Sequence, residues 1–145
     1  MQRVEPARWR AAIVDAIAGG HDCFVTLMGL DDGGVQVWLR LRRGSDEALR
    51  AAAGDDVVFT VDARDGVDTI IDLLPEAAWC EREAAEMFGI TFHGHETAPL
   101  LLPAGTPPPM RVDAWLEARQ TPWPGAHDPG AMTTRRRQLP PGVRP

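Results

Sequence analysis

The chain has 145 residues, which favours a single domain with a modest hydrophobic core. Its hydrophobic content of 44% and charged content of 25% are ordinary for a soluble globular protein, and its net charge of −6 argues against a general nucleic-acid-binding protein. All 15 basic residues are arginine, so a catalytic Schiff-base lysine is excluded.

The sequence favours a cytoplasmic protein with reduced thiols. No apolar run approaches the length of a transmembrane helix, and the first ten residues lack the apolar core of a signal peptide. We therefore expect a cytoplasmic location. The two cysteines, Cys23 and Cys80, form no CxxC pair and are expected to be free thiols.

Proline and charge divide the chain near residue 97. Residues 97–145 hold eleven of the 13 prolines and a net charge of +3, whereas residues 1–96 carry a net charge of −9. This contrast predicts a folded domain over residues 1–96 and an extended, Pro-rich tail over residues 97–145. Within the tail, one short helix is expected over residues 113–120, with Asp113 as its N-cap.

The first predicted element is a helix over residues 7–18. Its apolar positions, from Trp9 to Ile17, repeat at i, i+4, i+7 and i+8, which is typical of a helix that packs against a core. The glycine pair at 19–20 is expected to end this helix, because glycine readily adopts the backbone conformation of a helix stop.

Strands are predicted next. Residues 35–42 alternate apolar and polar side chains with period two, which indicates a half-buried strand. The sequence DDGG joins this run to residues 23–30 and predicts a β-hairpin, because glycine and aspartate tolerate the positive φ of hairpin turns. A short helix over residues 45–53 and a third strand over residues 56–62 are expected to follow.

Residues 67–88 are predicted to be mainly helical. The apolar spacing of residues 67–74 favours a helical turn over a strand. Pro75 suits the first turn of a helix that runs to Phe88 and stops at Gly89. Together these elements predict an α+β fold, with a small, mainly antiparallel sheet, helices packed on it and an extended Pro-rich tail.

The stretch CEREAAEMFGITFHGH, residues 80–95, concentrates the residues suited to chemistry. On a helical wheel its apolar positions form one stripe, flanked by Glu81 and Glu83, with Arg82 and Glu86 opposite. The simplest interpretation is a core-packed helix whose charges face water, including a weak Arg82–Glu86 pair. Because the carboxylates point apart, a catalytic carboxylate pair is disfavoured.

Two further interpretations of this stretch stay open. His93, His95 and Glu96 are three metal-ligand types close together in sequence, although no fourth ligand is evident and no HExxH motif exists. The alternative is a docking surface, because Trp79 lies among charges as interface anchors do, and three acids within six residues repel one another unless a basic partner meets them.

Cofactor motifs do not occur in the sequence. No GxGxxG or P-loop follows a predicted strand, no GxSxG nucleophile motif is present, and two cysteines cannot ligate an iron–sulfur cluster that needs four. We therefore expect that the chain binds no cofactor.

A longer motif runs through the same stretch. Trp79, the run Glu81-Arg82-Glu83, the run 86–90 (EMFGI), Phe92 and Gly94-His95 resemble the signature of the 30 kDa subunit family of respiratory complex I, the NADH-quinone oxidoreductase. The resemblance covers most of residues 7–96. The tail is similar to the family at 100–103 and 122–130, but it lacks the arginine that usually follows Gly-His and the Pro-Leu-Arg-Lys-Asp-like stretch.

The resemblance implies a non-catalytic scaffold in the peripheral arm of a complex I-like assembly, without a redox centre of its own, docked on the large subunit that helps to form the quinone site. It implies a location in the cytoplasm or, through the complex, on the cytoplasmic face of the cell membrane. Alternatives are a component of a related membrane-bound hydrogenase or formate hydrogenlyase, a diverged free-standing interaction protein, and a small metalloenzyme. The expected partner-binding residues are Trp79, Glu81, Arg82, Glu83, Glu86, Phe88, Gly89, Phe92 and His95.

Overall fold

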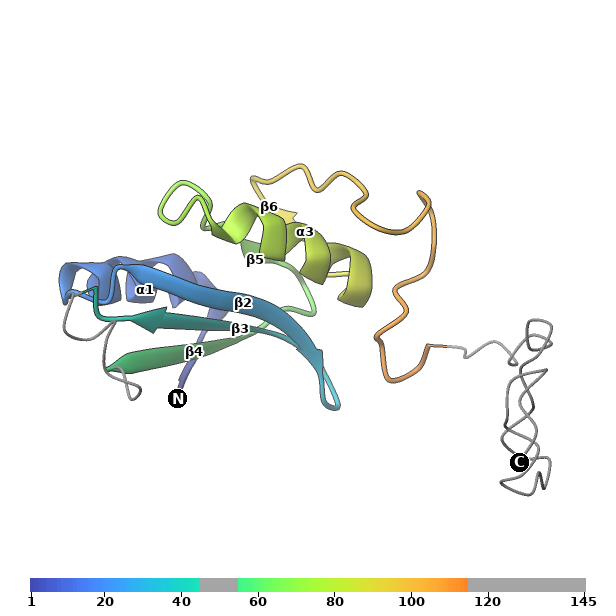
Figure 1. The fold of residues 1–145 in the computed structure, drawn as a ribbon. Coiled ribbons are helices and arrows are strands. Elements are labelled where there is room, and N and C mark those ends of the chain that lie inside the picture. The colour runs from blue at the N-terminus through green and yellow to red at the C-terminus, as the bar shows by residue number, and fades with distance from the viewer. Residues whose placement is uncertain (45–54, 115–145) are drawn as a thin grey trace, which may run out of the picture. The chain divides into compact units, whose positions relative to one another are not determined.

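The computed structural model describes residues 1–44 and 55–114 (Figure 1). A four-stranded sheet has the strand order β1-β4-β3-β2, and β5 and β6 form a second, two-stranded sheet. The helices α1 (Trp9–Ala18) and α3 (Ala77–Phe88) complete an α+β fold, which confirms the predicted class. The strands are β1 (Gln2–Val4), β2 (Cys23–Asp31), β3 (Val35–Arg42), β4 (Asp56–Asp62), β5 (Val67–Asp68) and β6 (Phe92–His93).

The strand β3 confirms the predicted alternation of apolar and polar residues. Its side chains at 35, 37, 39 and 41 are buried, whereas the intervening ones are half-buried or exposed. It pairs antiparallel with both neighbours, so that Leu39 stands opposite Leu27 of β2 and Phe59 of β4. The hairpin loop spans residues 32–34, where Gly33 adopts a φ of +71° that glycine tolerates best.

The strand β1 is an element that the sequence pattern did not predict. It pairs parallel with β4, placing Gln2 opposite Phe59 and Val4 opposite Val61. Three residues are too few to show an alternation, and the partner strand lies far along the chain. The sheet is therefore mixed, although its β2–β3 and β3–β4 pairs are antiparallel as expected.

The first helix begins two residues later than predicted. Pro6–Arg8 form a short 3-10 turn, η1, and α1 follows from Trp9. Trp9 and Ile13 are buried, which confirms the core-facing stripe. Arg10 donates to the Thr69 carbonyl and to Asp72, with 2.8 Å between Nη1 and Oδ1. Because Thr69 and Asp72 both precede α3 in the chain, α1 is tied to the segment that leads into α3.

The helical turn predicted for residues 67–74 is confirmed in its second half only. The Leu74 N–H donates to the Ile70 carbonyl at 2.8 Å, which closes one helical turn. Val67 instead begins β5, where its N–H donates to the Thr91 carbonyl at 2.9 Å, beside β6. Val67 in the first half and Ile70 and Leu74 in the second are all buried, so the helical spacing did not distinguish a strand from a turn here.

The helix α3 starts at Ala77, so the predicted start at Pro75 is two residues too early. Its end is confirmed, because Gly89 adopts a left-handed φ of +70° and donates its N–H to the Ala85 carbonyl at 2.9 Å. The helix packs along β2 (Figure 1). A Cβ at Gly29 of β2 would lie 2.4 Å from the Phe88 ring, so this strand and helix approach closely because position 29 has no side chain.

Two predicted helices fall wholly or mostly outside the described residues. The one over residues 45–53 lies entirely outside, and the one over residues 113–120 lies outside except for its first two residues. Among the helices of residues 1–44 and 55–114, none has the length and apolar character that crossing a membrane requires.

Candidate functional site

Glu81 of α3 is a buried carboxylate and not a surface charge. It is 0% exposed, and its oxygens accept from Thr69 Oγ1 at 2.7 Å, the Ile70 N–H at 2.9 Å and His95 Nδ1 at 2.8 Å. A carboxylate only accepts, so Nδ1 is the donor in the last contact. The interpretation that the Glu81 carboxylate faces water is wrong, because groups outside the helix converge on it.

Arg82 lies on the outer face of α3 but is engaged by the chain's own backbone. Its Nε donates to the Ala98 carbonyl at 3.2 Å and its Nη2 to the Pro99 carbonyl at 3.0 Å. The predicted Arg82–Glu86 ion pair is not among those formed by the described residues. Arg82 therefore holds residues 97–114, which we call the strap, against the helix.

Glu86, one helical turn further on, holds the strap at three consecutive residues. Its Oε1 accepts the N–H groups of Leu100 and Leu102, each at 2.9 Å, and its Oε2 accepts the N–H of Leu101 at 2.8 Å. Partial desolvation alone would raise the pKa of the Glu86 carboxyl. The three backbone donors and the charge of Arg82 outweigh this effect, and the pKa lies below its ordinary value of 4.5.

The far end of the strap is attached to α3 and to β2. The Met110 N–H donates to the Met87 carbonyl at 3.0 Å. The Val112 N–H donates to Asp31 Oδ2 at 3.1 Å, and Arg111 Nε lies 3.0 Å from the same oxygen. The first part of the predicted tail is thus held against the predicted domain, and the boundary at residue 97 stays a prediction based on composition.

Apolar side chains remain exposed around these attachments. Trp79 is 60% exposed, and the Arg82 guanidinium lies 5.7 Å from the centre of its ring, within cation–π range. On the strap, Leu101, Met110 and Val112 are 68%, 58% and 74% exposed. We refer to these four exposed apolar residues as the docking surface, after the role that is proposed for them below.

The remaining predicted partner-binding residues differ in their exposure. Glu83 is exposed, and His95 is half-buried against Glu81. Phe92 is only 4% exposed, so it and Glu81 have almost no surface with which to touch a partner. Phe88 and Gly89 serve the packing and the end of α3, as described above.

The proposed metal ligands are not assembled into a site. His95 is hydrogen-bonded to Glu81, whereas His93 lies beside Gly66, where an added Cβ would meet its ring. Within residues 1–44 and 55–114, no three His, Cys, Asp or Glu side chains are grouped as a metal ion requires. The metalloenzyme alternative therefore has no site in this part of the chain.

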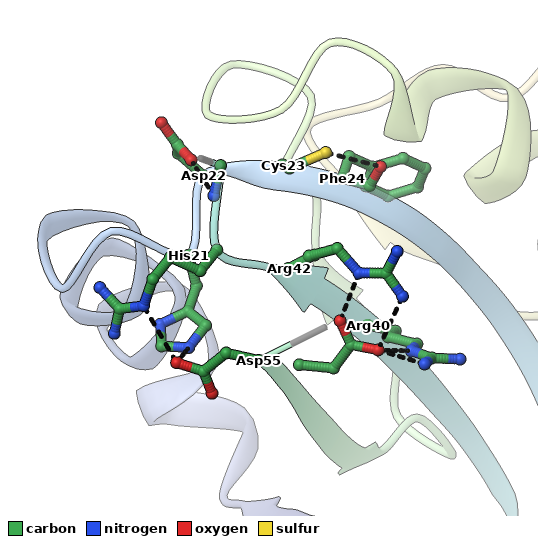
Figure 2. A network of polar contacts seen from close by, with 10 residues as sticks. His21, Asp22, Cys23, Phe24, Arg40, Arg42 and Asp55 are labelled. Atoms are coloured by element: carbon green, nitrogen blue, oxygen red, sulfur yellow. Dashed lines mark hydrogen bonds and ion pairs between the residues drawn. The ribbon is translucent and has the colours of Figure 1, made fainter. Parts of the chain in front are cut away.

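A second polar cluster lies at the ends of β3 and β4 (Figure 2). Asp56 accepts from Arg42 Nε and from Arg40 Nε, each at 2.7 Å. These bonds, Arg42 first, lower the pKa of Asp56 to about 2. Figure 2 also shows His21 beside Asp55, with 3.6 Å between Nε2 and Oδ2. Since Arg42 and Asp56 stand opposite each other in the sheet, the cluster joins neighbouring strands and has the form of a structural clamp.

The segment missed by the sequence prediction is the strap itself. Residues 100–103, LLLP, resemble the family, but no side-chain pattern indicates that their N–H groups bind Glu86. Backbone donors leave no mark in a sequence, so only the structure connects these residues to α3.

Comparisons with known proteins agree on one family. Residues 3–120 match the model of the family described as "Respiratory-chain NADH dehydrogenase, 30 Kd subunit". The NADH-quinone oxidoreductase C/D subunit of Pseudomonas fluorescens (strain SBW25) is 31% identical over 103 residues, which are 70% of this chain and 15% of that protein. The chain spans no more than 15% of the length of such curated relatives.

Solved structures share the fold at lower identity. A trypsin-resistant fragment (1-134) of Nqo5 superposes with a TM-score of 0.55 at 22% identity, covering 65% of this chain and 78% of the fragment. A chain of the membrane-bound sulfane sulfur reductase, an archaeal respiratory membrane complex, superposes with a TM-score of 0.63 at 16% identity, covering 79% of this chain and 71% of that one.

Proposed function

The chain belongs to the family of the 30 kDa subunit of respiratory-chain NADH dehydrogenase, and from this premise we propose that it is a non-catalytic structural subunit of a complex I-like assembly. In this proposal the chain docks on the large subunit that helps to form the quinone site. It lies in the peripheral arm, at the cytoplasmic face of the membrane, and brings no cofactor of its own.

The observation that carries the proposal is the exposure of Trp79 on the outer face of α3. An exposed tryptophan backed by a guanidinium is a common interface anchor, because it buries a large area at little cost in conformational entropy. Its neighbour Arg82 is fixed by two backbone carbonyls, so the anchor stands on a rigid support. The role fits recognition better than catalysis, since the buried Glu81 is committed to internal hydrogen bonds.

A second candidate is a subunit of a related membrane-bound complex, such as a hydrogenase. The observation that favours it is the fold shared with a chain of the membrane-bound sulfane sulfur reductase, an archaeal respiratory membrane complex. The neighbouring genes separate the two candidates. Genes for NADH dehydrogenase subunits support the first, and genes for hydrogenase subunits support the second.

The direct test is purification of the tagged chain at native expression level from membranes of its source. We expect the large-subunit homologue to co-purify in about equal amount. Trp79→Ala should weaken this association by about 2 kcal/mol, roughly thirtyfold in affinity. Val14→Ala, at an exposed apolar position on α1, is the matched control and should leave the association unchanged. Recovery of the chain alone contradicts the proposal.

A further inference from the structure

One charged side chain, Glu86, holds three successive backbone N–H groups of the strap. We propose that Glu86 is a positioning residue, which builds the strap half of the docking surface before any partner arrives. The inference rests on the proposed function, because it deepens the account of the same docking surface.

The attachments of the strap leave its apolar side chains free. Residues 98–102, 110 and 112 are bound through backbone carbonyl or N–H groups to Arg82, Glu86, Met87 and Asp31. Because backbone groups make these bonds, the side chains of Leu101, Met110 and Val112 are not used in them and stay exposed.

The same helix face links the strap to the tryptophan anchor. Trp79, Arg82 and Glu86 are spaced i, i+3 and i+7, so they share one side of α3. Arg82 contacts the Trp79 ring and the strap at once. Arg82, which supports Trp79, and Glu86, which holds the strap, lie on the same helix. A partner can therefore bind Trp79 and the strap without first having to order the strap, and this lowers the entropic cost of binding.

Charge defines the kind of partner that fits. Apart from the buried Glu81, residues 76–114 contain five acidic residues and two arginines, a net charge of −3 with histidine neutral. Both arginines are already engaged, Arg82 by carbonyls and Arg111 by Asp31, while Glu83 and Glu96 are exposed. The docking surface therefore suits a protein surface with apolar sockets and a basic rim. An anionic lipid surface would be repelled by the same acids.

The first experiment measures amide hydrogen exchange in the full-length chain alone. Glu86→Ala keeps a good helix former, and we expect exchange at Leu100, Leu101 and Leu102 to become at least about tenfold faster. Glu83→Ala removes the same charge from an exposed position and should leave these amides unchanged. Glu86→Gln retains one acceptor oxygen and should restore part of the protection. Equal exchange in the Glu86→Ala variant and the wild type overturns the positioning role.

The second experiment measures affinity for the purified large-subunit homologue. Glu86→Ala and Leu101→Ser should each weaken binding about tenfold, whereas Val14→Ser on α1 should not. If Glu86→Ala speeds exchange without changing affinity, the strap is not part of the docking surface, although the proposed function stands. If the wild type does not bind the large subunit, the proposed function fails. Wild-type binding to phosphatidylglycerol vesicles that is lost in Leu101→Ser overturns the assignment of a protein partner.

Discussion

Glu81 offers the sharpest test of how α3 is fixed in the fold. Replacing it with alanine leaves three donors, Thr69 Oγ1, the Ile70 N–H and His95 Nδ1, without their acceptor in a site that is 0% exposed. Each unsatisfied buried donor costs about 1–3 kcal/mol, and breaking a buried charged contact costs about 3–5 kcal/mol in total. We therefore expect Glu81→Ala to destabilise the fold by about 3–5 kcal/mol.

The assay is urea unfolding of the full chain followed by circular dichroism. A loss of this size is a large part of the roughly 5–15 kcal/mol that stabilises a typical domain, so the urea midpoint should fall clearly. In a thermal scan of the same variant, Tm should fall by about 12–20 °C. Glu83→Ala, two residues away and exposed, should change stability by less than about 0.5 kcal/mol. If both variants unfold at the same urea concentration, Glu81 does not hold α3 and the reasoning is refuted.

Three other predictions concern the sheet and the end of α3. The pKa of Asp56 is lowered from 3.8 to about 2, chiefly by its hydrogen bonds to Arg42. The ionised Asp56 carboxylate therefore stabilises the fold fully above about pH 4, and this stabilisation is lost as the pH falls towards 2. The urea midpoints of wild type and Asp56→Asn should converge in that range, and a constant difference contradicts the clamp. Gly29→Ala would press a Cβ into the Phe88 ring and should cost about 1–3 kcal/mol in urea unfolding, whereas no loss means that α3 is free to shift. In Gly89→Ala the alanine must adopt a left-handed φ of +70°, which should cost about 1–2 kcal/mol of folding stability and lower Tm. An unchanged Tm would show that the helix ends differently.

Local patterns predicted the elements whose signals lie within one segment. The alternation of residues 35–42 identified β3 and its buried face, because burial on one side of a sheet imposes period two. Gly89 marked the end of α3, because a left-handed stop favours glycine. These features depend on residues that are close together in sequence, so a local pattern is enough to predict them.

The features that the sequence did not reveal depend on distant groups. The helical wheel placed Glu81 at the edge of the apolar stripe, but its donors come from residues 11 to 14 positions away. The outward position of Glu86 was predicted, yet its partners are backbone N–H groups that carry no sequence signal. Likewise, β1 is short and pairs with a strand far along the chain. In each case the partner is brought close only by the tertiary fold, which a local sequence pattern does not show.

The docking role can be tested most directly by photo-crosslinking inside the assembled complex. A photoreactive amino acid at position 79, in place of Trp79, is irradiated in native membranes, and the crosslinked protein is identified by mass spectrometry. The same residue at Val14 of α1 is the control. The account predicts a crosslink from position 79 to the large quinone-site subunit and none to it from position 14. The absence of that crosslink from position 79, in a chain shown to be assembled, would contradict it.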